Sequence, residues 1–143
     1  MEMDCEEVLV MGEVEFVRIR LKGQSFLYNQ IRKMVGAIVQ AFRFDFDHTY
    51  IDNSLKHNSM KIPIAPGEGL MLNRVAYDHY NSIKDHRKSN KGEVSVPDCP
   101  KLKRELEDFR LDLVRFVGSQ EREKQVFARW LAMLDYNKDD YFE

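Results

Sequence analysis

The sequence predicts an α+β fold in which a small, mostly antiparallel sheet packs against helices. Three observations support this class. Residues 13–22 alternate between apolar and charged side chains, which is the pattern of a half-buried strand. Residues 26–43 carry apolar side chains at helical spacing, and residues 97–134 contain two more segments of that kind. With 143 residues, the chain can hold one domain or one domain with a small appendage.

The predicted strand, residues 13–22, has two unlike faces before Gly23 ends it. One face is apolar and consists of Val17, Ile19 and Leu21. The opposite face carries cations about 7 Å apart, namely Arg18, Arg20 and Lys22. Such a row is either a solvated face that guards a sheet edge or a docking surface for a polyanion.

The charge distribution around this strand makes it a candidate docking surface, although charge alone does not decide between the two interpretations. Residues 16–44 contain six basic residues and no acidic one, although the whole chain has a formal net charge of −2. The chain as a whole therefore does not have the charge of a nucleic-acid-binding protein, and only this local segregation points to a polyanion.

The first predicted helix spans residues 26–43. Its apolar stripe consists of Leu27, Ile31, Met34, Val35, Ile38 and Phe42. Arg32 lies at the border of the stripe, one turn after Tyr28 and one turn before Gly36. Glycine is unfavourable inside a helix, so we expect another group to approach the bare backbone at Gly36.

Residues 47–77 are expected to form a short helix, a loop and a strand. The helix would span residues 47–58, with Thr49 as a possible N-cap. Two prolines stiffen the loop at residues 62–69. The short apolar segment Leu70–Tyr77 predicts a second strand.

The remaining chain is expected to be mainly helical. We predict a core at residues 1–83, a linker at 84–96, a helical extension at 97–134 and an acidic tail at 135–143. The first helix of the extension would end near Val117, with Gly118 as its C-cap. Its inward side chains would be Leu102, Leu106, Phe109, Leu113 and Phe116. The second would span residues 120–134, with Phe127, Trp130, Leu131 and Leu134 inward.

Several kinds of chemistry have no support in the sequence. The histidines are scattered, so we expect no metal site. The sequence has no nucleophile elbow, P-loop or dinucleotide fingerprint. No apolar run reaches the ~18 residues that a membrane helix needs. The cysteines at 5 and 99 do not form a disulfide framework, which favours a reducing, intracellular compartment.

Two motifs resemble those of one enzyme family. The stretch from Gly23 to Gly36, GQSFLYNQIRKMVG, closely resembles a motif of the TruA-type tRNA pseudouridine synthases. Residues 62–72, IPIAPGEGLML, with Val75 and Tyr77, are similar to a later element of that family. Residues 109–134 are similar to the helical extension of its eukaryotic nuclear and mitochondrial members.

The resemblance implies an activity and a partial active site. The family isomerises uridine to pseudouridine in tRNA without a cofactor, using an aspartate in an R-x-D-x-G-V motif that this sequence lacks. We therefore expect residues 1–83 to be the C-terminal half of the catalytic core of a longer protein, located in the nucleus or mitochondrion and inactive alone. The expected partners are tRNA and the missing N-terminal half, with no membrane and with possible self-association through the exposed docking face.

The resemblance also implies roles for individual residues. Arg32 matches the basic residue that pairs with the catalytic aspartate, and Leu70 matches an apolar residue near the target base. Asn29 stands where the family usually has histidine. The expected RNA-binding residues are Arg18, Arg20, Lys22, Gln24, Asn29 and Lys33.

Two other functions remain open at this stage. The chain could be a standalone RNA-binding module without catalysis. It could also be a protein-interaction domain built on the C-terminal helices, with the basic segment incidental. An upstream R-x-D-x-G-V motif in the parent sequence would favour the enzyme, and salt-dependent tRNA binding would argue against the interaction domain.

Overall fold

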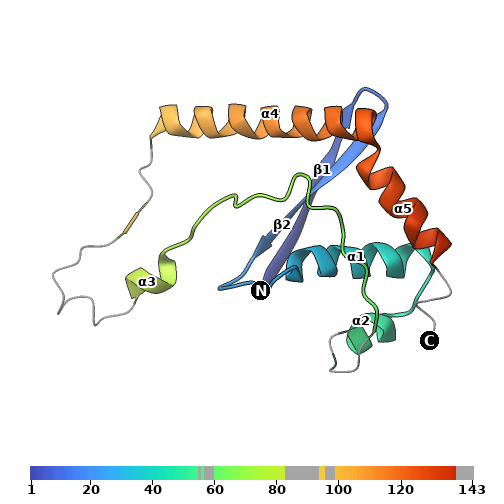
Figure 1. Cartoon of the computed structure of the whole chain (residues 1–143). Helices are drawn as coiled ribbons and strands as arrows, with labels where there is room; N and C mark the ends of the chain where they lie inside the picture. Colours follow the sequence, from blue (N-terminus) through green and yellow to red (C-terminus); the bar gives the residue numbers. More distant parts are fainter. Residues whose placement is uncertain (55, 57–59, 83–93, 96–98, 138–143) are drawn as a thin grey trace. The chain divides into compact units, whose positions relative to one another are not determined.

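The computed structural model describes residues 1–54, 56, 60–82, 94–95 and 99–137 and confirms the α+β class (Figure 1). Within these residues, two antiparallel strands are followed by helices. The elements are β1 (Glu2–Met11), β2 (Val14–Lys22), α1 (Gln30–Arg43), α2 (His48–Ser54), α3 (Asp78–Ser82), α4 (Pro100–Lys124) and α5 (Val126–Tyr136).

The hairpin contains one strand that the sequence pattern did not predict. β2 agrees with the expected strand, whereas β1 pairs with it along its whole length, from Glu2 opposite Lys22 to Met11 opposite Val14. Gly12 has φ +67° in the turn, a conformation that glycine adopts without steric cost. The pairing register shifts between Cys5 and Val8. This irregularity interrupts the alternation of inward and outward side chains along β1, so the sequence does not show a regular strand pattern there.

Helix α1 begins at Gln30 rather than at Phe26 as predicted. Asn29 has φ 58°, in the left-handed region, which interrupts helical geometry before Gln30. The backbone amide of Gln30 donates to the Leu27 carbonyl (3.0 Å), and the Gln30 side-chain oxygen accepts from the Leu27 amide (2.8 Å). Residues 27–30 therefore form a closed turn in front of the helix.

Helix α2 is capped by Asp47 and not by Thr49. The Asp47 carboxylate accepts hydrogen bonds from the amide (2.9 Å) and the hydroxyl of Thr49. These bonds, chiefly the one from the hydroxyl, hold the pKa of Asp47 below its ordinary value. The described part of the helix ends at Ser54. The predicted end at Asn58 lies outside the described residues.

The predicted strand at Leu70–Tyr77 is not formed within the described residues. This segment has no regular secondary structure, and it leads into α3, which the sequence pattern did not predict. A strand requires a neighbouring strand to satisfy its amides and carbonyls. The apolar composition of residues 70–77 indicated a strand, but no described segment pairs with it.

The break between the C-terminal helices lies later than predicted. α4 continues through Gly118 to Lys124, so Gly118 is not a C-cap. It is buried inside the helix, where an added Cβ would lie 3.6 Å from the Phe16 ring and 3.7 Å from the Met11 sulfur. Gln125, with φ 51°, separates the helices, and the Glu121 carboxylate caps α5 by accepting from the amides of Phe127 and Ala128.

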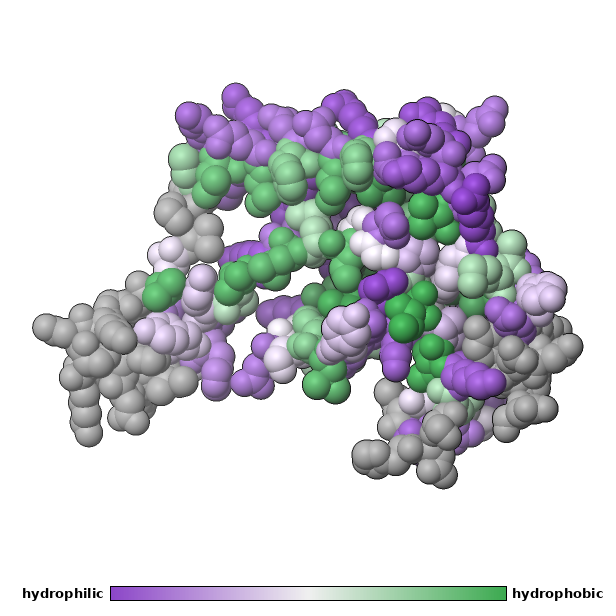
Figure 2. Space-filling model, in the orientation of Figure 1, coloured by the Kyte–Doolittle hydropathy of each residue, from purple (hydrophilic) through white to green (hydrophobic). Residues whose placement is uncertain are grey.

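Large apolar side chains remain exposed along α4. Figure 2 shows a hydrophobic side and a hydrophilic side on this helix. Three side chains that were expected to face inward are exposed in the structure, namely Leu102, Phe109 and Phe116. The stripe follows the helical period as predicted, but the other described side chains leave these three exposed.

The described residues form two compact units. One contains residues 1–68 and 115–143, the other contains residues 69–114, and α4 contributes to both. The buried hydrophobic side chains of the described residues are few: Ala37, Tyr50, Ala65 and Leu134. The predicted linker and acidic tail lie largely outside the described residues, so the predicted domain division stays a prediction. None of the described helices combines the length and apolar character that crossing a membrane requires.

Candidate functional site

Arg32 joins helix α1 to the proline-containing loop at residues 62–67. The backbone carbonyl of Arg32 accepts a hydrogen bond from the Ala65 amide (3.1 Å). Its side-chain Nε donates to the Ala65 carbonyl (2.6 Å). The backbone and the side chain of one residue thus hold both polar groups of Ala65, whose side chain is buried.

Gly36 allows the loop to lie directly on the helix. A Cβ built at Gly36 would be 1.9 Å from the Pro63 carbonyl oxygen, a distance that no side chain could tolerate. Pro63 is buried at this contact. The expected close approach at Gly36 is therefore real, and the approaching group is the backbone of the second sequence motif. Residues 23–36 and 62–67 come together in one place.

The guanidinium of Arg32 is oriented but retains donors. Its Nη1 donates weakly to the Asn29 side-chain oxygen (3.4 Å), and a Cβ built at Gly67 would lie 3.7 Å from its Cζ. Within the described residues, no hydrogen bond uses Nη2. A fixed, half-buried guanidinium with a free terminal edge is suited to bind a carboxylate or phosphate.

The three cations of β2 are neutralised by the neighbouring strand. They share one face, as expected, but each forms an ion pair with an acidic residue of β1. The pairs are Arg18–Glu6 (2.7 Å), Arg20–Glu6 (2.9 Å), Arg20–Asp4 (3.3 Å) and Lys22–Glu2 (3.9 Å). Because the sequence pattern did not predict β1, these ion pairs were not expected.

Arg43 is also paired. Its Nε and Nη2 donate to the two carboxylate oxygens of Asp135, each at 2.5 Å. This forked hydrogen bond raises the pKa of Arg43 above its ordinary value. Of the six basic residues in the 16–44 segment, two have no carboxylate partner within the described residues: Arg32 and Lys33.

The other predicted site residues have separate positions. Gln24 is exposed before α1, Asn29 is half-buried beside Arg32, and Lys33 is exposed on α1. Leu70 is 53% exposed. It belongs to the compact unit of residues 69–114, whereas Arg32 belongs to the unit of residues 1–68 and 115–143, so the position of Leu70 relative to Arg32 is not determined. The structure thus brings Asn29 and Arg32 together, and the roles of all these residues stay predictions.

Sequence reasoning missed the groups that hold Arg32 in place. Ala65 and Gly67 act through backbone atoms and small size, which leave little signal in a single sequence. The two prolines of the 62–69 segment did indicate a stiff loop, but not that it would pack against α1. Within the described residues, no group of three or more His, Cys, Asp or Glu side chains could hold a metal ion.

Comparison with known proteins identifies similar sequences. A family model described as tRNA pseudouridine synthase matches residues 2–78, which include both motifs around Arg32. The chain is 35% identical over 136 residues to the human pseudouridylate synthase 1 homolog, covering 94% of this chain and 31% of that protein. The mouse protein of the same name is 33% identical, with the same coverage.

A fungal relative gives the same result at lower identity. The tRNA pseudouridine synthase 1 of Schizosaccharomyces pombe is 28% identical over 139 residues, which cover 96% of this chain and 25% of that protein. The chain thus spans about a quarter to a third of the length of these curated relatives.

Proposed function

Because this chain belongs to the tRNA pseudouridine synthase family, we propose that it is part of an enzyme that isomerises uridine to pseudouridine in tRNA. The observation that carries this proposal is the junction of the two motifs at Arg32. Gly36 admits the loop, Ala65 holds the guanidinium, and the terminal edge remains available to a partner group. The hydrogen bond from Nε to Ala65 is enough to join the two motifs, so packing alone gives no reason for an arginine whose terminal edge stays free.

In this proposal, Arg32 pairs with the aspartate that attacks the target nucleotide. A guanidinium offers two parallel donors to a carboxylate and keeps its charge at every relevant pH. The bond to Ala65 uses Nε, so the side chain is oriented before the carboxylate arrives. The family resemblance assigns that aspartate to an R-x-D-x-G-V motif, which would belong to a longer polypeptide.

The remaining site residues would serve the RNA. Leu70 would lie against the target base, which must leave its stack before its glycosidic bond can react. Contacts to tRNA would come from Arg18, Arg20, Lys22, Gln24, Asn29 and Lys33. Lys33 would contribute most of the electrostatic attraction among these, because the strand cations already have carboxylate partners.

The rest of the longer polypeptide would be the principal protein partner. Few of the described apolar side chains are buried, while Val8, Val10, Val17 and Ile19 lie exposed on one face of the hairpin. An apolar sheet face of this kind is typical of a surface that another segment covers. Without that segment, we expect the chain to be inactive and prone to self-association, in a protein of the nucleus or mitochondrion.

Tritium release from tRNA with labelled uridine tests this function. The longer polypeptide should release tritium, and the 143-residue chain alone should not. Arg32→Lys in the longer polypeptide keeps the charge but loses the fork, so turnover should fall at least about tenfold with little loss of tRNA binding. An Arg32→Lys enzyme with normal turnover would refute the role given to Arg32. A longer polypeptide that releases no tritium would count against the enzyme itself.

A second function remains supported by one observation. The free edge of Arg32 and the unpaired Lys33 could hold RNA phosphates without any chemistry, in an RNA-binding module related to the enzyme. The parent sequence separates these functions, because an R-x-D-x-G-V motif upstream of this segment is needed only for catalysis.

A further inference from the structure

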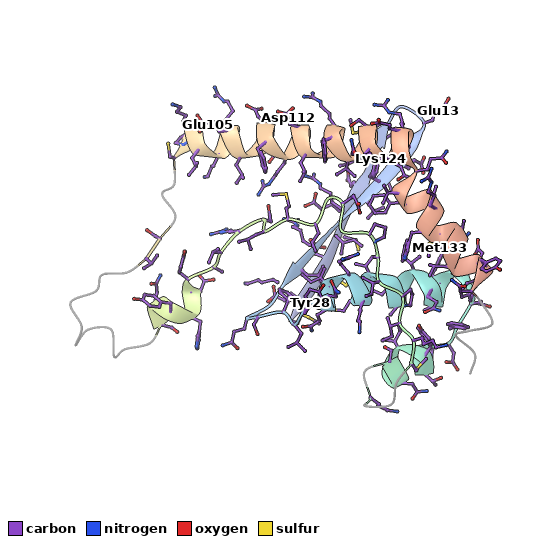
Figure 3. All side chains as sticks on the ribbon, viewed as in Figure 1. Glu13, Tyr28, Glu105, Asp112, Lys124 and Met133 are labelled. Carbon is purple, nitrogen blue, oxygen red and sulfur yellow. The ribbon has the colours of Figure 1, made fainter. Side chains whose placement is uncertain are left out.

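Tyr28 is the most exposed of the described aromatic side chains, and it lies in the hydrogen-bonded turn at residues 27–30. Figure 3 shows it at the N-terminal end of α1, and 93% of its surface is exposed. The neighbouring Leu27 is 80% exposed. Two large apolar side chains on consecutive residues carry a hydration cost, and other described side chains do not cover them.

The turn that carries Tyr28 is closed by several hydrogen bonds. Gln30 is bonded to the Leu27 backbone through its own amide (3.0 Å) and its side-chain oxygen (2.8 Å). The next residue, Asn29, accepts from Nη1 of Arg32 (3.4 Å), and its carbonyl accepts from the Lys33 amide (2.9 Å). Tyr28 is therefore presented outward by a well-bonded segment.

The charge around this turn favours a polyanionic ligand. Four of the six cations in residues 16–44 are paired with carboxylates. The two without a carboxylate partner among the described residues, Arg32 and Lys33, follow Tyr28 within five residues. Tyr28 lies two residues before α1, and Arg32 and Lys33 lie in its first turn, so the ring and these charges are at the same end of the helix. An aromatic ring beside unpaired cations is the combination that binds single-stranded nucleic acid.

We propose that Tyr28 is a stacking platform for an unpaired base of the RNA, with Lys33 holding the adjacent backbone. This inference rests on the proposed function, because it assumes that the end of α1 faces RNA. The phenol ring stacks on one base, and its hydroxyl stays in water. Leu27 supports the edge of the same base. Removing a base from its stack is unfavourable, and a replacement stacking partner offsets part of that cost.

Phe42 provides a matched control on the same helix. It is 92% exposed, almost the same as Tyr28, and it lies near the other end of α1. The cation beside it, Arg43, is bound to Asp135 by two hydrogen bonds. Phe42 is thus an equally exposed ring without an unpaired cation next to it.

The test uses the 143-residue chain and a short single-stranded oligoribonucleotide that contains one 2-aminopurine. The fluorescence of this base falls when an aromatic ring stacks on it. Tyr28→Ala should weaken binding about tenfold, as expected for one lost stacking contact, and should abolish most of the quenching. Tyr28→Phe should keep both, Tyr28→Leu should lose the quenching, and Phe42→Ala should change neither. Tyr28 is too exposed for these changes to affect folding.

Three results would overturn the proposal. The first is a Tyr28→Ala chain that binds and quenches like the unmodified chain. The second is an unmodified chain that does not bind the oligoribonucleotide. The third is a Tyr28→Ala chain with unchanged RNA binding and altered sedimentation, which would assign Tyr28 to a protein interface. None of these results affects the enzyme proposal, which depends on tritium release. Conversely, Tyr28-dependent binding in a longer polypeptide that releases no tritium would leave a binding module and refute the enzyme.

Discussion

A methyl group added at Gly36 should separate the two motifs, whereas the same change at Gly118 should be harmless. Both glycines are buried inside helices. The Cβ of Gly36→Ala would lie 1.9 Å from the Pro63 carbonyl oxygen and 2.9 Å from its carbonyl carbon. At Gly118 the nearest atoms, on Phe16 and Met11, are 3.6 and 3.7 Å away, which is ordinary contact.

The expected free energies of unfolding follow from these distances. At Gly36 the loop must move by more than ~1 Å to reach a normal contact, and the two hydrogen bonds between Arg32 and Ala65 then break. Overpacking of this kind costs about 1–3 kcal/mol, and each hydrogen bond is worth about 1 kcal/mol. The gain in helix propensity, about 1 kcal/mol, offsets only part of this. We expect Gly36→Ala to be destabilised by about 2–4 kcal/mol.

Gly118→Ala gains the helix propensity without the clash, so it should be more stable than the unmodified chain by up to about 1 kcal/mol. Urea unfolding followed by far-ultraviolet circular dichroism measures both variants under the same conditions. Equal stability of Gly36→Ala and the unmodified chain would refute the reasoning, because it would mean that the loop does not lie against α1. A destabilised Gly118→Ala would show that Phe16 and Met11 lie closer than the structure has them.

Three further predictions concern single contacts. Gln40 is fully buried, and its side-chain oxygen accepts a hydrogen bond from the Tyr50 hydroxyl. Gln40→Leu should therefore lower the free energy of unfolding by about 1–3 kcal/mol. In a double-mutant cycle, Gln40→Leu with Tyr50→Phe should lower it by less than the sum of the two single changes. The pKa of Asp47 is lowered in the folded chain, so its ionised carboxylate stabilises α2 at every pH above the ordinary carboxyl pKa of about 3.9. This stabilisation is lost as the pH falls through the lowered pKa. Nuclear magnetic resonance titration of the Thr49 amide should follow this change, and a Thr49→Val chain that titrates identically would contradict it. Lys33→Gln should lower the salt slope of RNA binding by about 1, while Arg20→Gln should lower it less because Asp4 and Glu6 already pair with Arg20. Equal slopes for the two variants would show that those ion pairs open on binding.

Short-range patterns were predictable and pairings were not. The alternation of residues 14–22 and the stripe of α1 arise from neighbours in the sequence, and both elements formed within a few residues of the expected bounds. The prediction of a strand at residues 70–77 was wrong because it relied on apolar composition. A strand also needs a neighbouring strand to pair with, and composition does not show whether one is present. Gly118 looked like a helix end, but α4 continues through it and buries it against Phe16 and Met11, two contacts that the local sequence does not reveal.

The order of residues along the chain was enough to mark Arg32, Gly36 and the 62–69 loop as related to one enzyme family, because motif identity needs no coordinates. Only the folded chain decided which charges are free. Carboxylates far away in sequence reach four of the cations between residues 16 and 44, and they leave the two beside Tyr28 without an acidic partner among the described residues. Ion pairing acts over a few ångströms of space regardless of separation along the chain, so a linear pattern of charge does not determine it.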